Sequence, residues 1–334
     1  MERLSSADIE NARRLCALTN SFYRAQASSF SDTRRDPWPG WRRCLDAAGL
    51  AAGESPEAGD PQRVGEPQRA GDPQRTSGDP LRVGNPQRAS GEPGARIDSH
   101  GAAGPRPLVV LDLGCGNLRF ERFLCDALPE APFVFHAVDA CDELAALAEH
   151  ALPADRAHVL YQGFDACAAL AEGRSLAGAL EVADRSCDLA VAFGFMHHVP
   201  LAVWRAEVLR ALVRKVRPGG FVAASFWRFM ESPKLARKAV RETARAASEL
   251  PGALPHLCEG DHLLGWQGKP GAFRYCHHFS DDEIDALVRS VAPAANPIAA
   301  FRADGAPGNL NSYVVLRVET APSGSSTNLG KMNN

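Results

Sequence analysis

Apolar and polar positions near the start of the chain follow a helical period. Within residues 6–26 the apolar positions at that spacing are Ile9, Leu15, Leu18 and Phe22. The pattern restarts after Pro37 in PWPGWRRCLDAAGL, since proline fixes a helix-compatible φ and often stands in the first turn. Residues 1–52 therefore form a predicted N-terminal helical segment.

Beyond residue 106 the pattern alternates between short apolar runs and amphipathic stretches. The runs that predict strands are PLVVLDL (107–113), FVFHAVDA (133–140), AHVLYQGFDA (157–166), CDLAVAFGF (187–195), RPGGFVAASFW (217–227), 297–303 and 312–319. Stretches of helical period separate them, and one carries a capping box, Ser280 with Glu283. Such alternation is typical of an α/β fold with an open, mostly parallel sheet and helices on both faces. We expect seven strands within residues 106–319.

Residues 53–105 interrupt this pattern. Between residues 59 and 96 stand six imperfect copies of one short unit, such as GDPQRV, GEPQRA and GNPQRAS. Proline blocks helices, and the unit has almost no large apolar residue to bury. A solenoid would need an apolar face in each repeat. We therefore predict a disordered insertion over 53–105, and a disordered tail over 320–334; a dedicated recognition element is the alternative for the repeat.

Composition limits the remaining possibilities. Hydrophobic residues make up 45% of the chain, which allows a sizeable core, and the net charge of −3 argues against a uniformly basic nucleic-acid coat. No apolar run is long enough to cross a bilayer, and the N-terminus is polar, so we expect a cytoplasmic protein without membrane contact. The nine cysteines form no C-x-x-C pair, which argues against a metal site or a disulfide framework.

Candidate ligand-binding residues follow the predicted strands. In open parallel sheets ligands bind at the carboxyl ends of the strands. The residues placed there are Asp112, Gly114 and Gly116 after the first strand, Asp139 after the second, Phe164 and Asp165 after the third, and Phe193 after the fourth. The glycines let a ligand approach the backbone, and Asp139 could accept both hydroxyls of a ribose. Asp165 could accept from an adenine amino group, with Phe164 covering the ring.

The spacing of the glycine turn distinguishes two cofactors. The turn reads G-x-G-x-L, whereas a nicotinamide enzyme needs a further glycine where the pyrophosphate crosses the helix N-terminus. S-adenosylmethionine has no phosphate, so the turn and the two acids that follow it, at the ends of the second and third strands, favour a methyltransferase. The alternative is that Asp112, Asp139 and Asp165 each cap a helix.

Several segments together resemble class I S-adenosylmethionine-dependent methyltransferases. These are VLDLGCGN, AVDA, FDA, SCDLAVAFGFMHHV and VRPGGFVAASFW. FYRAQASSFSDTRRDPWPGWRRCLD is similar, more narrowly, to the N-terminal signature of the wobble-uridine tRNA carboxyl methyltransferases, and FRYCHHFSDDEI resembles their R-Y-x-H segment. The resemblance implies a Rossmann-like fold whose N-terminal helices cover the active site. It also implies tRNA as a partner, leaves open a small activating protein, and places Tyr23 at the cofactor.

The same resemblance assigns FSDTRRDPWPGW (30–41) to the active site. A carboxylate is already anionic at neutral pH, so its O-methylation needs a clamp that strips water and aligns the group, and no general base. Arg34 is the predicted clamp, and His197 the predicted substrate-facing residue of the MHH stretch. The alternatives are that Arg34 only pairs with neighbouring aspartates and that His197 is a buried structural histidine.

Three readings of function remain open. The first is methylation of a carboxylate such as a carboxymethyl wobble uridine in tRNA, to which a stripe of basic residues would contribute: Lys234, Arg237, Lys238, Arg241 and Arg245. The stripe could equally be a solvated helix face. The second reading is a small-molecule methyltransferase of the same fold. The third, prompted by Leu118 in place of a third glycine, is a non-catalytic adenosylmethionine-binding module.

Overall fold

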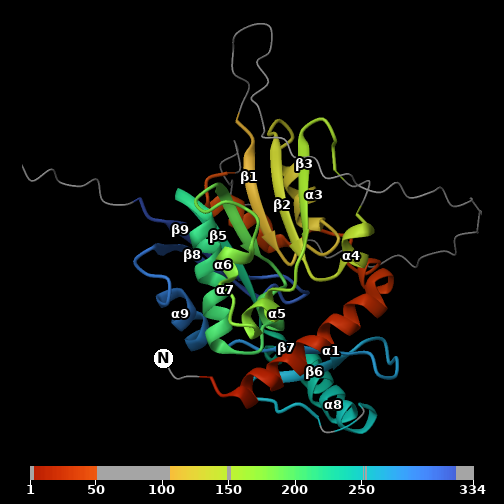
Figure 1. Cartoon of the computed structure of the whole chain (residues 1–334). Helices are drawn as coiled ribbons and strands as arrows, with labels where there is room; N and C mark the ends of the chain where they lie inside the picture. The colour runs from red at the N-terminus through yellow and green to blue at the C-terminus, as the bar shows by residue number, and fades with distance from the viewer. Residues whose placement is uncertain (1–3, 51–105, 149–151, 251, 253, 321–334) are drawn as a thin grey trace, which may run out of the picture. The chain divides into compact units, whose positions relative to one another are not determined.

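The centre of the fold is a sheet of seven strands. The structure is a computed structural model, and it describes residues 4–50, 106–148, 152–250, 252 and 254–320. Its strands are β1 (Leu108–Leu113), β2 (Phe133–Asp139), β3 (Ala157–Gly163), β4 (Cys187–Ala192), β5 (Val216–Trp227), β8 (Ala295–Ala303) and β9 (Asn311–Val318). Their order is β3-β2-β1-β4-β5-β9-β8 (Figure 1). Strands β1 to β5 are parallel, and β9 is antiparallel to β5 and β8. The predicted α/β, Rossmann-like architecture is confirmed.

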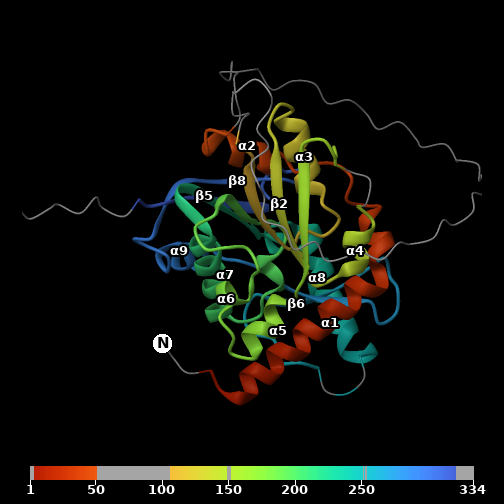
Figure 2. The same cartoon turned by 45° about the horizontal axis from the view of Figure 1, so that its top comes forward.

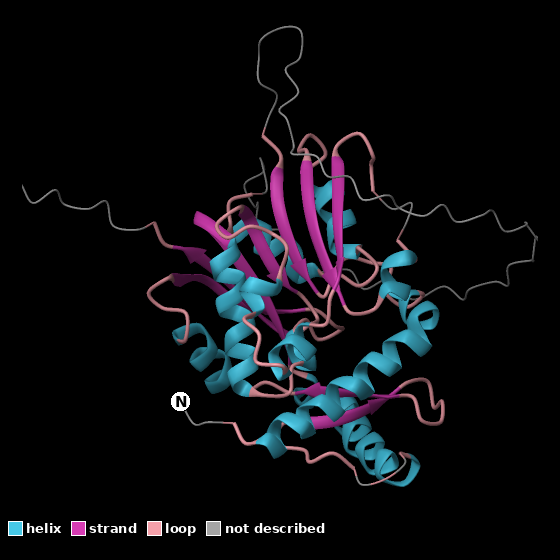
Figure 3. Ribbon diagram, viewed as in Figure 1, coloured by secondary structure: helices cyan, strands magenta, loops and turns pink. Residues whose placement is uncertain are grey.

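Helices cover both faces of this sheet (Figure 3). One face carries α2 (Pro39–Ala47) and α3 (Arg119–Ala127), and the other carries α5 (Ala166–Ala171), α6 (Leu176–Ala179), α7 (Ala202–Lys215) and α9 (Asp281–Arg289). The two layers lie on opposite sides of the strands in Figure 2. Strand β4 is buried along its whole length, which is why its sequence is apolar except for Asp188, whose carboxylate pairs with Arg106 and Arg217.

A second, two-stranded sheet lies apart from the first. Strands β6 (Asp261–Gly265) and β7 (Phe273–His277) pair antiparallel beside α1 (Ser6–Ser31) and α8 (Pro233–Glu249). Two threonines accept hydrogen bonds from backbone N–H groups at the outer edges of this sheet. The Thr19 hydroxyl accepts from the N–H of Tyr275, and the Thr243 hydroxyl accepts from the N–H of Leu263. The hydrophobic pattern did not predict this hairpin, because its edges are covered by helices distant in sequence.

The N-terminal segment is helical, as predicted, and α1 extends to Ser31, five residues past the predicted end. It begins with a capping box between Ser5 and Asp8. The stretch CDELAALAEHAL (141–152), one of those with a helical period, contains the short α4 (Asp142–Ala146), and residues 149–151 lie outside the described part. The predicted disordered insertion and tail also lie outside it, apart from Thr320. No helix in the described ranges is long and apolar enough to span a bilayer.

Candidate active site

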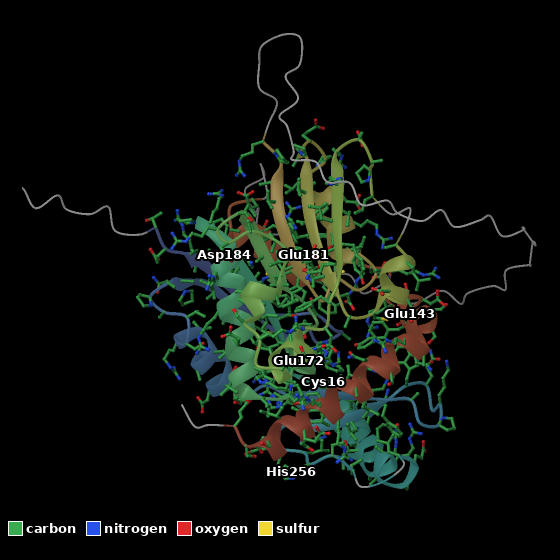
Figure 4. All side chains as sticks on the ribbon, viewed as in Figure 1. Cys16, Glu143, Glu172, Glu181, Asp184 and His256 are labelled. Carbon is green, nitrogen blue, oxygen red and sulfur yellow. The ribbon has the colours of Figure 1, made fainter. Side chains whose placement is uncertain are left out.

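A cavity of about 430 Å³ lies at the carboxyl ends of β1 to β5, with α1 and β7 completing its wall. All ten residues predicted for the site line it: Tyr23, Arg34, Asp112, Gly114, Gly116, Asp139, Phe164, Asp165, Phe193 and His197. Cys16, which is labelled on α1 in Figure 4, lines it as well. The structure therefore brings together residues from the N-terminal segment and from the end of every parallel strand.

The glycine turn after β1 has a backbone conformation that lets a ligand approach the main chain closely. Gly114 has φ +88°, and a Cβ there would stand 2.9 Å from the Phe195 ring. Gly116 has φ +53°, and a Cβ there would meet no atom within 4 Å. The backbone at Gly116 thus faces open space inside the cavity. Leu118, the residue in place of a third glycine, adopts φ +53°, and its buried side chain packs beside Cys115 and Ala137.

Asp139 holds the turn against the end of β2. One carboxylate oxygen accepts from the backbone N–H of Gly116 at 2.8 Å, and the other accepts from that of Cys141 at 2.8 Å. Burial raises the pKa of Asp139, while these backbone donors oppose the rise. Each oxygen keeps a second acceptor position, which two adjacent hydroxyls of a ligand could use.

Asp165 performs the helix-capping role left open by the sequence and also contacts α1. Its Oδ1 accepts from the backbone N–H of Ala168 at 2.9 Å, at the start of α5. Its Oδ2 accepts from Nδ2 of Asn20 at 2.7 Å. Asn20 lines the cavity and was not singled out from the sequence. Capping and a ligand-facing position are therefore combined in one residue.

Two neutral histidines also line the cavity, from the 3-10 turn Met196–His198 after β4. Nδ1 of His198 lies 2.8 Å from the carbonyl oxygen of Tyr275, so that nitrogen carries the proton, and Nε2 accepts from the Tyr23 hydroxyl at 2.8 Å. Burial and the charge of Arg274 lower the pKa of His198 to about 3. Burial and His198 also lower the pKa of His197, whose Nδ1 is buried without a hydrogen-bond partner in the described residues.

Arg34 is half-buried on the cavity wall. Its guanidinium stacks over Phe30 at 4.8 Å and donates to the carbonyl and hydroxyl of Thr33. Its neighbour Arg35 is exposed and pairs with Asp32 at 3.7 Å. Within the described ranges Arg34 forms no ion pair, so the alternative of simple pairing holds for Arg35 and does not describe Arg34.

Arg274 is the principal site residue that the sequence analysis missed. It lies on β7, is only 6% exposed, and lines the cavity. Its Nε and Nη1 are buried without hydrogen-bond partners in the described residues, and its guanidinium stacks over Phe22 at 4.8 Å. The FRYCHHF segment was the signal, but its arginine could not be placed without knowing that β7 packs against α1.

The two tryptophans of PWPGW pack against each other and against a third arginine. The guanidinium of Arg119 lies 4.9 Å from the ring centroids of both Trp38 and Trp41, and donates to the carbonyl of Asp36 at 2.9 Å. Burial lowers the pKa of Arg119 to about 10. This stack fixes the loop after α1 against α3 and thereby holds Arg34 at the cavity.

A metal ion has one geometrically suitable position among the described residues. Ligand atoms of His197, His198 and Cys276 lie within 4.8 Å of one another. However, both ring nitrogens of His198 already have partners, and burial raises the pKa of the Cys276 thiol to about 11. The guanidinium of Arg274 adds positive charge at the same wall. We assign no metal here.

Comparison with known proteins identifies part of the chain. Residues 111–224, from β1 to β5, match the family model described as a methyltransferase domain. Comparison with curated protein sequences gives no match. Among solved structures, an S-adenosylmethionine-dependent methyltransferase from Methanosarcina mazei is similar, at 19% identity over 64% of this chain and 94% of that chain, with a TM-score of 0.47.

Two other solved structures are similar. The 1,6-didemethyltoxoflavin-N1-methyltransferase of Burkholderia thailandensis, with bound 1,6-didemethyltoxoflavin and S-adenosylhomocysteine, is 18% identical over 64% of this chain and 72% of that one, with a TM-score of 0.40. An S-adenosylmethionine-dependent methyltransferase from Clostridium acetobutylicum is 10% identical over 64% of this chain and 84% of that chain, also with a TM-score of 0.40.

The fold, the cavity and the domain match together define a methyltransferase. Its cofactor is S-adenosylmethionine. The residues present suit that molecule, because the open backbone at Gly116, the Asp139 carboxylate and the unpartnered Oδ1 of Asp112 face or adjoin one cavity. The non-catalytic reading is not retained.

Proposed function

We propose that this enzyme methylates a carboxylate oxygen, and that the carboxylate belongs to a carboxymethyl uridine in tRNA. The observation that carries the proposal is Arg274, whose Nε and Nη1 are buried in the cavity wall with no hydrogen-bond partner in the part of the chain that the structure describes. Leaving buried charged donors unpaired costs free energy, so such a group is retained where a ligand satisfies it. A carboxylate matches a guanidinium in charge and in geometry.

Arg34 provides a second cation for the same ligand. The charge of Arg274 contributes to lowering the pKa of Arg34, although burial is the main cause, so the two guanidinium groups act on each other. In this proposal Arg274 and Arg34 hold the carboxylate and exclude water from it. Aromatic rings fix both groups before the substrate arrives: Phe22 stacks on Arg274, and Phe30 stacks on Arg34 and also lies 5.9 Å from the Arg274 guanidinium.

For the cofactor, we propose that Asp139 binds the ribose and that Asp165 with Phe164 binds the adenine. Gly114 and Gly116 admit the ligand to the backbone, Asp112 faces its amino group, and Tyr23 and Phe193 complete the wall. When bound, S-adenosylmethionine supplies the methyl group: an O–C bond forms as the S–C bond breaks, sulfur keeps the electron pair, and no proton moves. Arg274 and Arg34 need only align the anionic oxygen.

The histidines fit a reaction without a base. Burial and neighbouring cations keep His197 and His198 neutral, so neither carries a charge that would compete with the arginines. In the proposal Nδ1 of His197 makes a hydrogen bond with the substrate.

Helix α8 supports RNA as the carrier of the carboxylate. The basic stripe on this helix has two parts. Arg241 pairs with Glu242, and Arg245 pairs with Glu242 and Glu249. Lys234 and Arg237, by contrast, are exposed and form no ion pair in the described ranges. Lys238 lies between these halves, and its pKa is lowered by burial and by Arg274. Unpaired cations therefore continue from α8 toward the cavity, as a phosphate backbone would require.

The test is incubation of the enzyme with methyl-labelled cofactor and total cell extract. The proposal expects label in RNA, and release of that label as methanol under mild base, since only an ester is cleaved there. Base-stable label in RNA contradicts ester chemistry. Label found only in small molecules contradicts RNA as the substrate and indicates a small-molecule substrate instead. Lys234→Glu with Arg237→Glu should weaken RNA methylation, whereas Arg289→Glu on the exposed part of α9 is the matched control.

A further inference from the structure

A buried pair of carboxyl groups lies behind the glycine turn. Glu121, in the first turn of α3, is 0% exposed, and both of its oxygens are buried without hydrogen-bond partners in the described residues. Asp112, at the end of β1, is 3% exposed, and its Oδ1 is also unpartnered. Asp112 lines the cavity and Glu121 does not, so Glu121 approaches Asp112 from the protein side.

The two groups are within hydrogen-bonding reach of each other. Two ionised carboxylates only accept, so the pair becomes a hydrogen bond only if one group carries a proton. Burial, and for Asp112 the charge of Glu121, raises the pKa of both groups, to about 8 for Glu121. A proton placed between them supplies a donor that no side chain of the described residues provides.

The charges around the pair favour that proton. Asp139 acts on both carboxyls from the end of β2, and the Cys115 and Cys125 thiols are also close enough to be affected by Glu121. Arg119 lowers the pKa of Asp112, but burial, Glu121 and Asp139 raise it and are the larger causes. The guanidinium of Arg119 lies against the rings of Trp38 and Trp41, 4.9 Å from each centroid.

We propose that Glu121 and Asp112 share one proton in the cofactor-free enzyme, and that binding of the cationic cofactor releases it. Glu121 is then a positioning residue: it sets the charge and orientation that Asp112 presents to the cavity. The inference rests on the proposed placement of Asp112 at the cofactor, and it is independent of which substrate is methylated.

The expected signature is a pH-dependent affinity. S-adenosylmethionine brings a sulfonium and an ammonium, and positive charge beside Asp112 favours loss of the shared proton. Where binding releases one proton, affinity rises up to about tenfold per pH unit, by linkage. In Glu121→Gln the amide donates to Asp112 permanently, so this part of the pH dependence disappears. The cofactor's own amine titrates equally with both proteins, so the comparison removes its contribution.

The experiment is calorimetry of S-adenosylmethionine binding near pH 6.5, in two buffers of different ionisation enthalpy, without substrate. The wild-type protein should release a large fraction of one proton on binding, and Glu121→Gln should release almost none. Asp126→Asn removes an exposed carboxylate from the same helix, and it should match wild type. Infrared spectra of the cofactor-free protein should show a buried protonated carboxyl that Glu121→Gln lacks. Absence of proton release from wild type overturns the proposal even if the variant fails to fold, and so does equal release from wild type and Glu121→Gln.

Discussion

The Tyr23 hydroxyl donates to Nε2 of His198 across 2.8 Å, although 175 positions separate the two residues. The bond joins α1 to the turn after β4, and its acceptor is fixed because Nδ1 of His198 faces the carbonyl of Tyr275. Three separate segments of the chain therefore meet in one line of hydrogen bonds at the cavity wall. This arrangement gives the N-terminal segment a defined position over the strand ends.

Removing that bond should destabilise the protein. Tyr23→Phe leaves Nε2 of His198 without its donor, and a buried group left unpaired costs about 1–3 kcal/mol. We expect a lower free energy of unfolding by that amount in chemical denaturation. Tyr161→Phe is the control, because the Tyr161 hydroxyl donates to Asp142 at 2.8 Å but its side chain is exposed. Equal losses for both variants would contradict a special role of the Tyr23 bond.

Asp139→Ala should weaken S-adenosylmethionine binding by about 1.5–3 kcal/mol, typical of charge-assisted hydrogen bonds. The same change removes the acceptor of the Gly116 N–H, so the glycine turn loosens as well. Calorimetry measures the affinity, and a thermal melt without cofactor separates loss of binding from loss of fold. Unchanged affinity in a folded Asp139→Ala protein would falsify the ribose assignment.

The sequence predicted the seven-stranded sheet because its strands are mostly apolar runs bounded by turn residues. The chosen residues that follow strands line one cavity because the strand ends converge, and Tyr23 and Arg34 join them from the N-terminal segment. It did not predict β6 and β7, whose edges are satisfied by Thr19 and Thr243 from distant helices. Arg274 and Glu121 were missed for a related reason. Each is a charged residue in an ordinary local pattern, and only tertiary packing makes it buried and unpartnered.

Acid should destabilise the fold through the histidines of the cavity. The folded-state pKa of His198 is lowered to about 3, below the unfolded value near ~6.5. A neutral buried histidine therefore contributes stability that is fully present above about pH 6.5 and is lost as pH falls toward the folded pKa. We expect the free energy of unfolding to fall by up to about 1.4 kcal/mol per pH unit for each such histidine.

This acid sensitivity is measurable by urea titration between about pH 4 and 7. His198→Gln should flatten the curve, because it removes the titrating group while keeping a polar side chain. Activity should behave differently: at saturating cofactor, kcat/KM for the carboxylate substrate should stay level from about pH 6 to 8, since that substrate is ionised throughout and no base is required. A rate that falls with the protonation of a histidine in that range would indicate general-base catalysis instead.

Arg34 and Arg274 should be needed for the substrate and not for the cofactor. Each holds a guanidinium at the cavity against an aromatic ring, and Arg274 has two donors free for a ligand. Arg274→Ala and Arg34→Ala should each lower kcat/KM by about 10- to 100-fold, the equivalent of a charge-assisted hydrogen bond of about 1.5–3 kcal/mol. Calorimetry should find cofactor affinity nearly unchanged. Lysine at either position should restore activity only in part, because an ammonium cannot form the planar two-point contact.

Arg35→Ala is the matched control, since Arg35 is exposed and pairs with Asp32 on the surface. If Arg34→Ala, Arg274→Ala and Arg35→Ala all retained wild-type kcat/KM, the carboxylate clamp would have to be abandoned, and with it the reason for choosing an anionic substrate.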